Sequence, residues 1–311
     1  MAKYLGKRII ISVVTLFVIL LVLFLLLQFM PGSPFNDQKL APEQVEALKA
    51  KYGLDKPVII QFFNYVGNML KGDLGVSYNL SANTPITELL ANRFPVTIKI
   101  GFLSMVFGTL AGLLLGFLTA FFKSKIMRFF YHFLTLLGIA VPSYLFAMFF
   151  SYFLGYKGEV FPLLYDFRAP VSSSVMPVMA LSLSVMAIIA RFAKAEGSDV
   201  MKSDYVLLAR CQGLSSANII LRYILKNSLM PVITVMAGLL VGLLTGSLVI
   251  EQMFSIPGVG ALLTNAISSN DYSVVIALSF VYSALYIVVM LILDILYCVL
   301  DPRVRLGGAP E

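Results

Sequence analysis

Few residues in this sequence have the types and spacing that catalysis needs. His132 is the only histidine, and neither a zinc site nor a Ser-His-Asp triad is credible around it, because no cluster of cysteines or carboxylates joins it. No G-x-x-x-x-G-K-[ST] run occurs, so the chain has no loop of its own to cradle the phosphates of ATP. We therefore expect no catalytic residue and no metal site, and we expect His132 to be an interfacial side chain.

Two carboxylates stand next to long apolar runs. Glu251 falls at the end of one run and Asp294 near the end of another. Ionisable groups inside a membrane usually mark proton or ion pathways, and a proton-coupled carrier would show more of them. If the chain takes part in transport, we expect the energy to come from elsewhere. Cys211 and Cys298 are expected to be reduced, structural residues.

The composition indicates what kind of scaffold positions these residues. Apolar residues make up 59% of the 311 residues, compared with roughly 45–50% in soluble domains. Charged residues make up 13%, compared with about 25%. The net charge of +7 suggests nucleic acid, but the basic residues are clustered between apolar runs, as membrane topology requires. The sequence predicts an integral membrane protein that binds no nucleic acid.

Six stretches without Asp, Glu, Lys or Arg are long enough to cross a bilayer, which takes about 20 apolar residues. They are Ile9–Asn36, Ile100–Phe122, Phe129–Tyr156, Ala169–Ala190, Asn227–Ile250 and Tyr272–Leu293. Every backbone polar group in lipid needs an internal partner, so we expect all six to be helices. The predicted fold class is an all-α integral membrane protein with six transmembrane helices.

Lys and Arg in the loops predict the orientation. With the N-terminus inside, the cytoplasmic segments hold fourteen of them, and the two short outer loops hold only Lys157 and Arg168. Both termini are therefore expected to be cytoplasmic. The predicted parts are an N-terminal segment with the first span (1–30), an extracytoplasmic helical segment (31–99), a core of five spans (100–305) and a C-terminal tail (306–311).

The extracytoplasmic segment is expected to contain three helices. The first covers Pro42–Tyr52, the second is capped by Asp55 and has an apolar side, and the third starts at Thr84-Pro85. The segment is too ordered for a linker and too small for an enzyme domain. It could be a cap packed on the outer mouth of the spans or a docking surface for an external partner.

The longest cytoplasmic loop, 191–227, predicts two short amphipathic helices joined at Gly213, because glycine allows the positive φ that ends a helix. The two helices form a protruding knob with an apolar face around Val206, Ala209, Ile219 and Tyr223. Such a face needs a groove on a partner, unless it packs on the chain's own spans or lies among lipid headgroups. The candidate caps are Ser203 or Asp204 for the first helix and Ser215 or Ser216 for the second.

Within this loop, the run Tyr205–Ser215 followed by Arg222, Lys226-Asn227 and Pro231 resembles the EAA loop of ABC-importer permeases. Leu207 and Leu208 stand where the name of that loop implies Glu and Ala. Other segments agree, in order along essentially the whole chain, with the oligopeptide, dipeptide and nickel branch of that family. They are Gly53–Pro57, Gly72–Gly75, Arg93–Thr97, Pro142-Ser143, Glu251–Gly260, Asp271-Tyr272, Asp294–Tyr297 and Asp301–Arg305. The large first outer loop resembles that of the B-type subunit.

The resemblance implies a type I ABC-importer permease fold in the inner or plasma membrane of a bacterium or archaeon. It implies that the chain is not an enzyme and binds no cofactor, because partner subunits bind ATP and Mg and hydrolyse the ATP. The implied partners are a homologous C-type permease subunit, two cytoplasmic ATPase subunits or domains, an extracytoplasmic substrate-binding protein and membrane lipid. The substrate would be an oligopeptide or dipeptide, and the residues that bind it are unknown.

The resemblance also implies that the knob is the loop that couples the permease to the ATPase. The residues to which it assigns this role are Tyr205, Val206, Leu208, Ala209, Gly213, Leu214, Ser215, Arg222 and Pro231. Pro231 is expected to start the fifth span at its first turn. Within the family, nickel, a metallophore or a glycopeptide could replace the peptide. In other classes, a stand-alone secondary carrier or channel, or a membrane anchor without a pathway, stays open.

Overall fold

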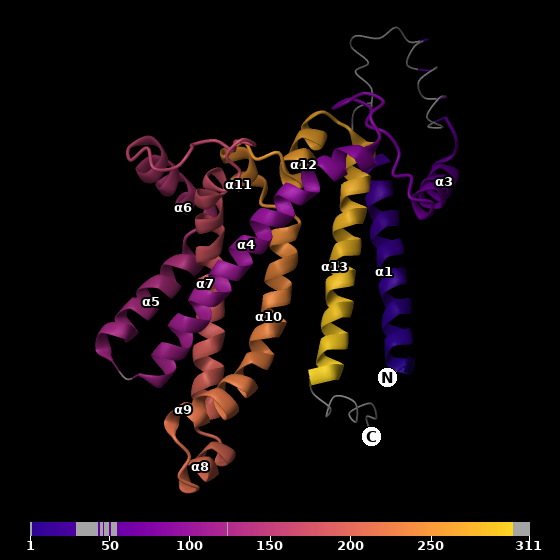
Figure 1. Ribbon diagram of the computed structural model, residues 1–311. Coiled ribbons are helices and arrows are strands. Elements are labelled where there is room, and N and C mark those ends of the chain that lie inside the picture. The colour runs from indigo at the N-terminus through magenta and orange to yellow at the C-terminus, as the bar shows by residue number, and fades with distance from the viewer. Residues whose placement is uncertain are drawn as a thin grey trace. The chain divides into compact units, whose positions relative to one another are not determined.

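The structure, a computed structural model, describes residues 2–28, 55–122 and 124–300, together with Glu43, Glu46 and Ala50 (Figure 1). Side chains are not described at 2–5, 7, 27–28, 293–294 and 296–300. The expected helix over Pro42–Tyr52, with those three exceptions, and the side chains of Asp294 and Cys298 therefore lie outside the described residues. The described part is helical, and its single β-bridge joins Val76 and Pro85.

Five helices in the described part are long and apolar enough to cross a membrane, and one bent pair of helices provides a sixth candidate. The five are α1 (Ala2–Gln28), α4 (Ile86–Phe121), α7 (Ser172–Met201), α10 (Lys226–Leu244, counted from Ser216) and α13 (Tyr272–Leu300). The prediction of an all-α, multi-pass membrane protein is confirmed.

The third expected span is not one straight helix. α5 (Lys125–Ala140) ends just before Pro142, and α6 (Ser143–Phe150) continues after a bend of 105°. Val141 has φ −94° and ψ 122°, the extended conformation that a following proline ring favours. Pro142 also lacks the N–H that would continue the ladder of helical hydrogen bonds. The expectation of a continuous span over Phe129–Tyr156 was therefore wrong at this position.

Other helices begin or end at residues different from the ends of the charge-free runs. A helix can continue beyond the hydrocarbon core, where a charged residue does not end it. α4 starts at Ile86 rather than Ile100, directly after the expected Thr84-Pro85 start. α7 continues to Met201, eleven residues beyond the expected end. α10, in contrast, ends at Leu244, where Gly246 (φ 85°) starts the turn into α11 (Leu248–Met253).

The described chain divides into two compact units, of which unit 1 comprises 1–95 with 257–311. In unit 1, α1 packs side by side with α13 (Figure 1), and α3 (Val58–Leu70) packs on α1. α12 (Val259–Ser268) packs on α13. α3 is preceded by Pro57 without a side-chain cap, so the expected cap at Asp55 is not observed. The fully buried side chains here include Phe62, Ile86, Leu262 and Leu278.

Unit 2 comprises Val96–Ile256 and is organised around α7, on which α5, α6 and α10 pack. Three glycines of α4 lie against the same helix at a spacing of four residues. A Cβ on Gly108, Gly112 or Gly116 would lie 2.6, 2.7 and 2.6 Å from atoms of α7. Small residues with this spacing let two membrane helices approach closely, so α4 and α7 form a rigid base for the segment that follows α7.

Candidate functional site

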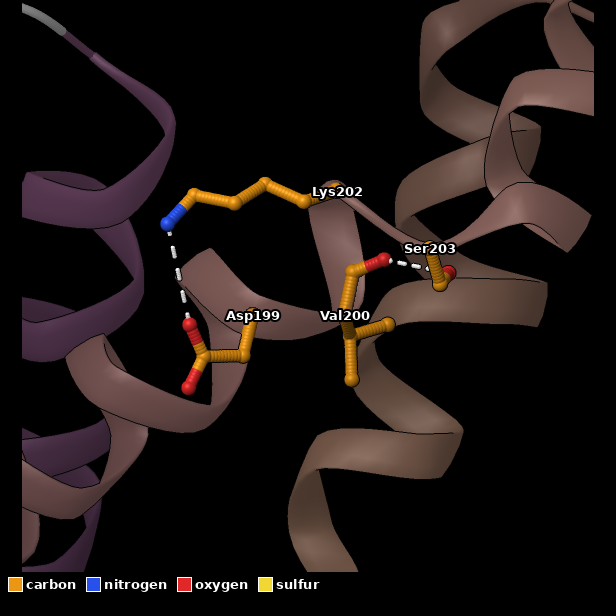
Figure 2. A network of polar contacts seen from close by, with 4 residues as sticks. All are labelled: Asp199, Val200, Lys202 and Ser203. Atoms are coloured by element: carbon orange, nitrogen blue, oxygen red, sulfur yellow. Dashed lines mark hydrogen bonds and ion pairs between the residues drawn. The ribbon is translucent and has the colours of Figure 1, made fainter.

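The predicted knob forms at the end of α7, through a tight turn (Figure 2). The Ser203 hydroxyl donates to the Val200 carbonyl at 2.6 Å, and the Ser203 N–H donates to the same carbonyl. Lys202 Nζ lies 3.7 Å from Asp199 Oδ1 with both side chains exposed, and such a surface ion pair contributes little. α8 (Asp204–Cys211) then starts with Ser203 at the N-cap position, but no side chain caps it.

Gly213 ends α8 in the conformation that the sequence predicts, with φ 76°. Its N–H donates to the Arg210 carbonyl at 3.0 Å, and the Leu214 N–H donates to the Ala209 carbonyl at 3.3 Å. These two bonds define a Schellman motif, in which the glycine position is left-handed. Ser215 then caps α9 (Ser216–Ile219) by accepting from the Asn218 N–H at 3.4 Å. The predicted turn and the second cap are both confirmed.

α9 is not a separate helix, because the chain continues through the π-helical turn η2 (Ile220–Leu225) directly into α10. Pro231 consequently lies inside α10, and the expectation that it starts the fifth span is wrong. A proline inside a helix removes one backbone hydrogen bond. Membrane helices tolerate this where neighbouring groups satisfy the freed carbonyls. At the start of α10, Asn227 Nδ2 donates to the Tyr223 carbonyl in the preceding π-helical turn at 2.7 Å.

The apolar face that the sequence offered to a partner is occupied within the chain. Val206, Ala209 and Ile219 are buried together with Ile224, and Phe121 and Met201 from the ends of α4 and α7 are among the residues that pack against them. The expectation that this face needs an external groove is therefore wrong, and the alternative of packing on the chain's own spans is correct. The contacts attach the knob firmly to the spans.

A different set of apolar side chains on the knob is exposed. Leu208 is 58% exposed and lies two residues after the buried Val206, on the opposite side of α8. We call the exposed set the α8 apolar face, which consists of Tyr205, Leu207, Leu208 and Leu214. In Figure 1, α8 lies beyond the end of α7 at the tip of unit 2. An exposed apolar patch at a protruding tip is typical of a surface that another protein covers.

The structure thus divides the predicted coupling residues into groups. Tyr205, Leu208, Leu214 and Arg222 are exposed, whereas Val206 and Ala209 are buried and attach the knob. Gly213 and Ser215 shape the turn. Pro231 lies in a membrane helix away from the turn. The coupling role of the set remains a prediction, and Leu207, which belongs to the exposed face, was not in it.

The buried carboxylate of Glu251 joins two elements of unit 2. Glu251 lies in α11, and its Oε1 accepts a hydrogen bond from Thr97 Oγ1 of α4 at 2.8 Å. Both side chains are buried. The nearby Phe254 carbonyl accepts from the Tyr165 N–H at 2.8 Å. The family segments Arg93–Thr97 and Glu251–Gly260 therefore meet through a hydrogen bond between two buried side chains.

A second buried carboxylate, Asp271, anchors the turn that precedes α4 in unit 1. Asp271 Oδ2 accepts from Ser77 Oγ at 2.6 Å and from the backbone N–H groups of Tyr78, Asn79 and Leu80, each at 3.0 Å. Successive N–H groups that converge in this way form an anion-binding nest. Asp271 directly precedes α13, so the nest fixes the 77–80 turn to the start of that helix. The motif Asp271-Tyr272 was recognised in the sequence, but its partners were not.

His132 and Cys211 are the remaining side chains that the sequence singled out. His132 is exposed on α5, in ring contact with Tyr131. Cys211 is an exposed free thiol. Among the described residues, no group of three or more His, Cys, Asp or Glu side chains could hold a metal ion.

Comparisons with known proteins identify the family. Residues 112–306 match the family described as "Binding-protein-dependent transport system inner membrane component", and residues 1–101 match the family of its N-terminal part. The chain is 40% identical to the dipeptide transport system permease protein DppB of Lactococcus lactis subsp. cremoris, over 98% of this chain and all of the relative. It is 34% identical to DppB of Bacillus subtilis, over 98% of this chain and 99% of the relative.

A third relative is the oligopeptide transport system permease protein OppB of Escherichia coli. It is 32% identical over 98% of this chain and all of the relative. The chain therefore belongs to the family of inner membrane components of binding-protein-dependent transport systems, as a B-type ABC-importer permease.

Proposed function

We propose that this chain is one of two permease subunits of an ATP-driven importer, and that the pair carries dipeptides or oligopeptides inward. The names of the three relatives, which refer to dipeptide or oligopeptide transport, support the substrate class. Nothing in the described residues or in these relatives favours nickel. The observation that supports the coupling to a partner most directly is the exposed α8 apolar face on a knob whose other side is buried against the spans.

In the proposed orientation both termini are cytoplasmic. The bias of Lys and Arg toward the inner loops supports it. The folding of unit 2 agrees with it, because the end of α4 packs against the knob through Phe121 and leads to the basic start of α5, where Lys125 and Arg128 lie. The segment from α3 to the start of α4 would then be on the external side, where a binding protein delivers substrate.

The partner ATPase would bind ATP and Mg, and this chain would bind neither. Tyr205, Leu208 and Leu214 would enter a groove on the ATPase, with Arg222 at its polar edge. A short amphipathic helix in a groove is a recurrent way to dock. The buried cluster around Val206 and Ile219 is important for this role, because it packs α8 against the ends of α4 and α7. A movement of α8 would therefore move these helices, and α10 with them.

The route for the substrate would lie between two permeases that rock as rigid bodies. A hydrated peptide needs a cavity of several hundred Å3, as ligand sites typically do. Two bundles can enclose such a space more easily than one bundle of six helices can. The second bundle would be a homologous C-type subunit, so the proposed assembly has two permeases, two ATPase subunits or domains and an external binding protein.

The test is reconstitution of the assembly in liposomes, followed by uptake of labelled dipeptide, a longer peptide and Ni²⁺. We expect peptide uptake that requires ATP, the ATPase and the binding protein. Uptake of Ni²⁺ without peptide would contradict the substrate class. Peptide flux through the isolated chain would contradict the pairing and would support a stand-alone carrier.

A further inference from the structure

The helix α3 exposes an apolar stripe that no part of the proposed function uses. Ile59, Phe63 and Leu70 are 67%, 60% and 83% exposed. They recur at positions i, i+4 and i+11, which places all three along one side of the helix. Val66, at i+7, lies on the same side but is half-buried against the core of unit 1. The helix has 13 residues and no charged side chain. Exposure of such a stripe to water would cost free energy, because exposed apolar patches favour burial.

The neighbour of α3 indicates what surrounds this stripe. The Phe62 ring is buried against α1, with its centroid 5.4 Å from that of Phe17 and 5.6 Å from that of Phe24. α1 is a candidate membrane span over Arg8–Leu26, and Phe17 is its middle residue. The contacts of Phe62 therefore report the depth of α3 along a membrane helix, and both helices belong to unit 1.

The depth places Phe62 inside the hydrocarbon. Phe24 lies seven residues from Phe17, which is about 10 Å along a helix. The half-thickness of the hydrocarbon core is about 15 Å. A ring that touches both side chains is therefore between the midplane and the surface of one leaflet. Phe63 is the next residue and is in ring contact with Phe62 at 5.7 Å, so the exposed stripe begins at the same depth.

We propose that α3 is embedded in one leaflet of the membrane beside α1, and that Ile59, Phe63 and Leu70 face lipid acyl chains. This stripe continues the apolar surface of α1, where Ile10, Val13 and Val14 are also exposed. The helix is about 20 Å long and so cannot cross a core of about 30 Å. Its outer surface would thus be a lipid-binding face in place of a docking face for an external protein.

The polar residues of α3 agree with this placement. Asn64 and Asn68 are exposed and lie one turn apart, on a side of the helix that contains neither Phe62 nor the apolar stripe. Lys56 and Lys71 are exposed just outside the two ends. Lysine stems can lie along apolar surface while the charged groups reach the headgroups. The helix therefore has three sides, which face α1, acyl chains and the polar boundary.

The experiment uses the fact that the chain contains no tryptophan, so that a single introduced indole is the only one. Phe63→Trp places it on the stripe, and Asn68→Trp places it on the polar side of the same helix as the matched control. The full chain is reconstituted in phosphatidylcholine nanodiscs whose scaffold contains no tryptophan, with and without bromine atoms on the acyl chains. Bromine quenches indole emission only from within the hydrocarbon, and iodide quenches it only from water.

We expect brominated lipid to quench the emission of Phe63→Trp several-fold more than that of Asn68→Trp, and iodide to show the reverse order. Ile59→Trp should behave like Phe63→Trp, which guards against a local distortion at position 63. Quenching of Phe63→Trp and Ile59→Trp by iodide alone would show that the stripe lies in water, where an external protein could bind it. That result would overturn the proposal. Quenching by neither agent would mean that protein covers the stripe, which would also overturn it.

These outcomes do not depend on the proposed function. Both leaflets of a nanodisc contain brominated lipid, so the result is the same whichever way the chain is oriented. No partner subunit and no transport is needed for the measurement. A failure of peptide uptake therefore leaves this inference intact, and a failure of this inference leaves the proposed transport intact.

Discussion

Ser77 Oγ donates a hydrogen bond to Asp271 Oδ2 at 2.6 Å, although 194 residues separate them in the sequence. The bond connects the turn before α4 to the residue that precedes α13, and so closes unit 1 at one end. Both residues are completely buried. A carboxylate that satisfies several backbone N–H groups and one hydroxyl in this way fixes the geometry of the turn.

We expect Asp271→Ala to loosen the 77–80 turn. The substitution leaves three backbone N–H groups and the Ser77 hydroxyl without their acceptor, and each unsatisfied buried group costs about 1–3 kcal/mol. The expected result is a lower unfolding temperature of the purified chain and faster proteolysis within residues 72–85. Ser77→Ala is the matched control, because it removes one donor to Asp271 and the acceptor of the Ser81 N–H, while the carboxylate keeps its three backbone donors. It should therefore cost less than Asp271→Ala. Equal protease resistance of Asp271→Ala and the unmodified chain would contradict the anchoring role.

The hydrogen bond between Thr97 and Glu251 predicts a second stability effect, this time in unit 2. Thr97→Ala removes a donor from a buried carboxylate, so we expect a loss of about 1–3 kcal/mol in the free energy of unfolding. Thr97→Ser keeps the hydroxyl and should retain most of that stability. Thermal unfolding in nanodiscs measures both. If Thr97→Ser were as unstable as Thr97→Ala, the methyl group rather than the hydrogen bond would be responsible.

Local signals in the sequence predicted local features correctly. Gly213 and Ser215 act on residues two to five positions away, so their turn and cap can be read from residue type alone. The start of α13 at Tyr272 follows for the same reason, since the apolar run begins there.

Features that depend on tertiary packing could not be predicted in this way. The apolar pattern of the knob is the same whether Val206 faces a partner or the end of α4, and only the fold shows that Phe121 is close. The partner of Asp271 is 194 residues away, and that of Glu251 is 154 residues away. The bend before Pro142 was predictable from the proline itself. The spans were predicted by counting consecutive residues without charge, and that count takes no account of a proline.

The turn at Gly213 should tolerate residues according to their ability to adopt a positive φ. A Cβ at this position would meet no atom within 4 Å, so the backbone conformation alone determines the effect. Gly213→Val should cost on the order of 1–3 kcal/mol and should weaken ATPase association and peptide uptake, with normal insertion. Gly213→Asn should retain more of both, because asparagine adopts this conformation readily. Copurification of the ATPase and uptake measure the effect, and normal values for Gly213→Val would contradict the prediction.

Two neighbouring residues of α8 should separate attachment of the knob from docking. Val206 is buried and Leu208 is exposed. We expect Val206→Ala to destabilise the chain by on the order of 1–3 kcal/mol, as large-to-small core substitutions do. Leu208→Ala should leave the unfolding temperature unchanged and reduce the amount of ATPase that copurifies with the permease. If Leu208→Ala bound the ATPase normally while Val206→Ala did not, docking would occur through a face other than the one that α8 exposes.

The orientation can be tested with two exposed positions that the proposal places on opposite sides of the membrane. Ala82 lies in the turn before α4, and Asp199 lies near the end of α7. Cys211 and Cys298 are first replaced by Ser, and Ala82→Cys or Asp199→Cys is introduced. In intact cells or spheroplasts, an impermeant maleimide should label Ala82→Cys. It should label Asp199→Cys only after permeabilisation, because the segments expected on the Asp199 side contain fourteen Lys and Arg residues, which favour the cytoplasm. The opposite pattern would invert the topology, place α8 outside, and remove the ATPase from the surface that the α8 apolar face offers.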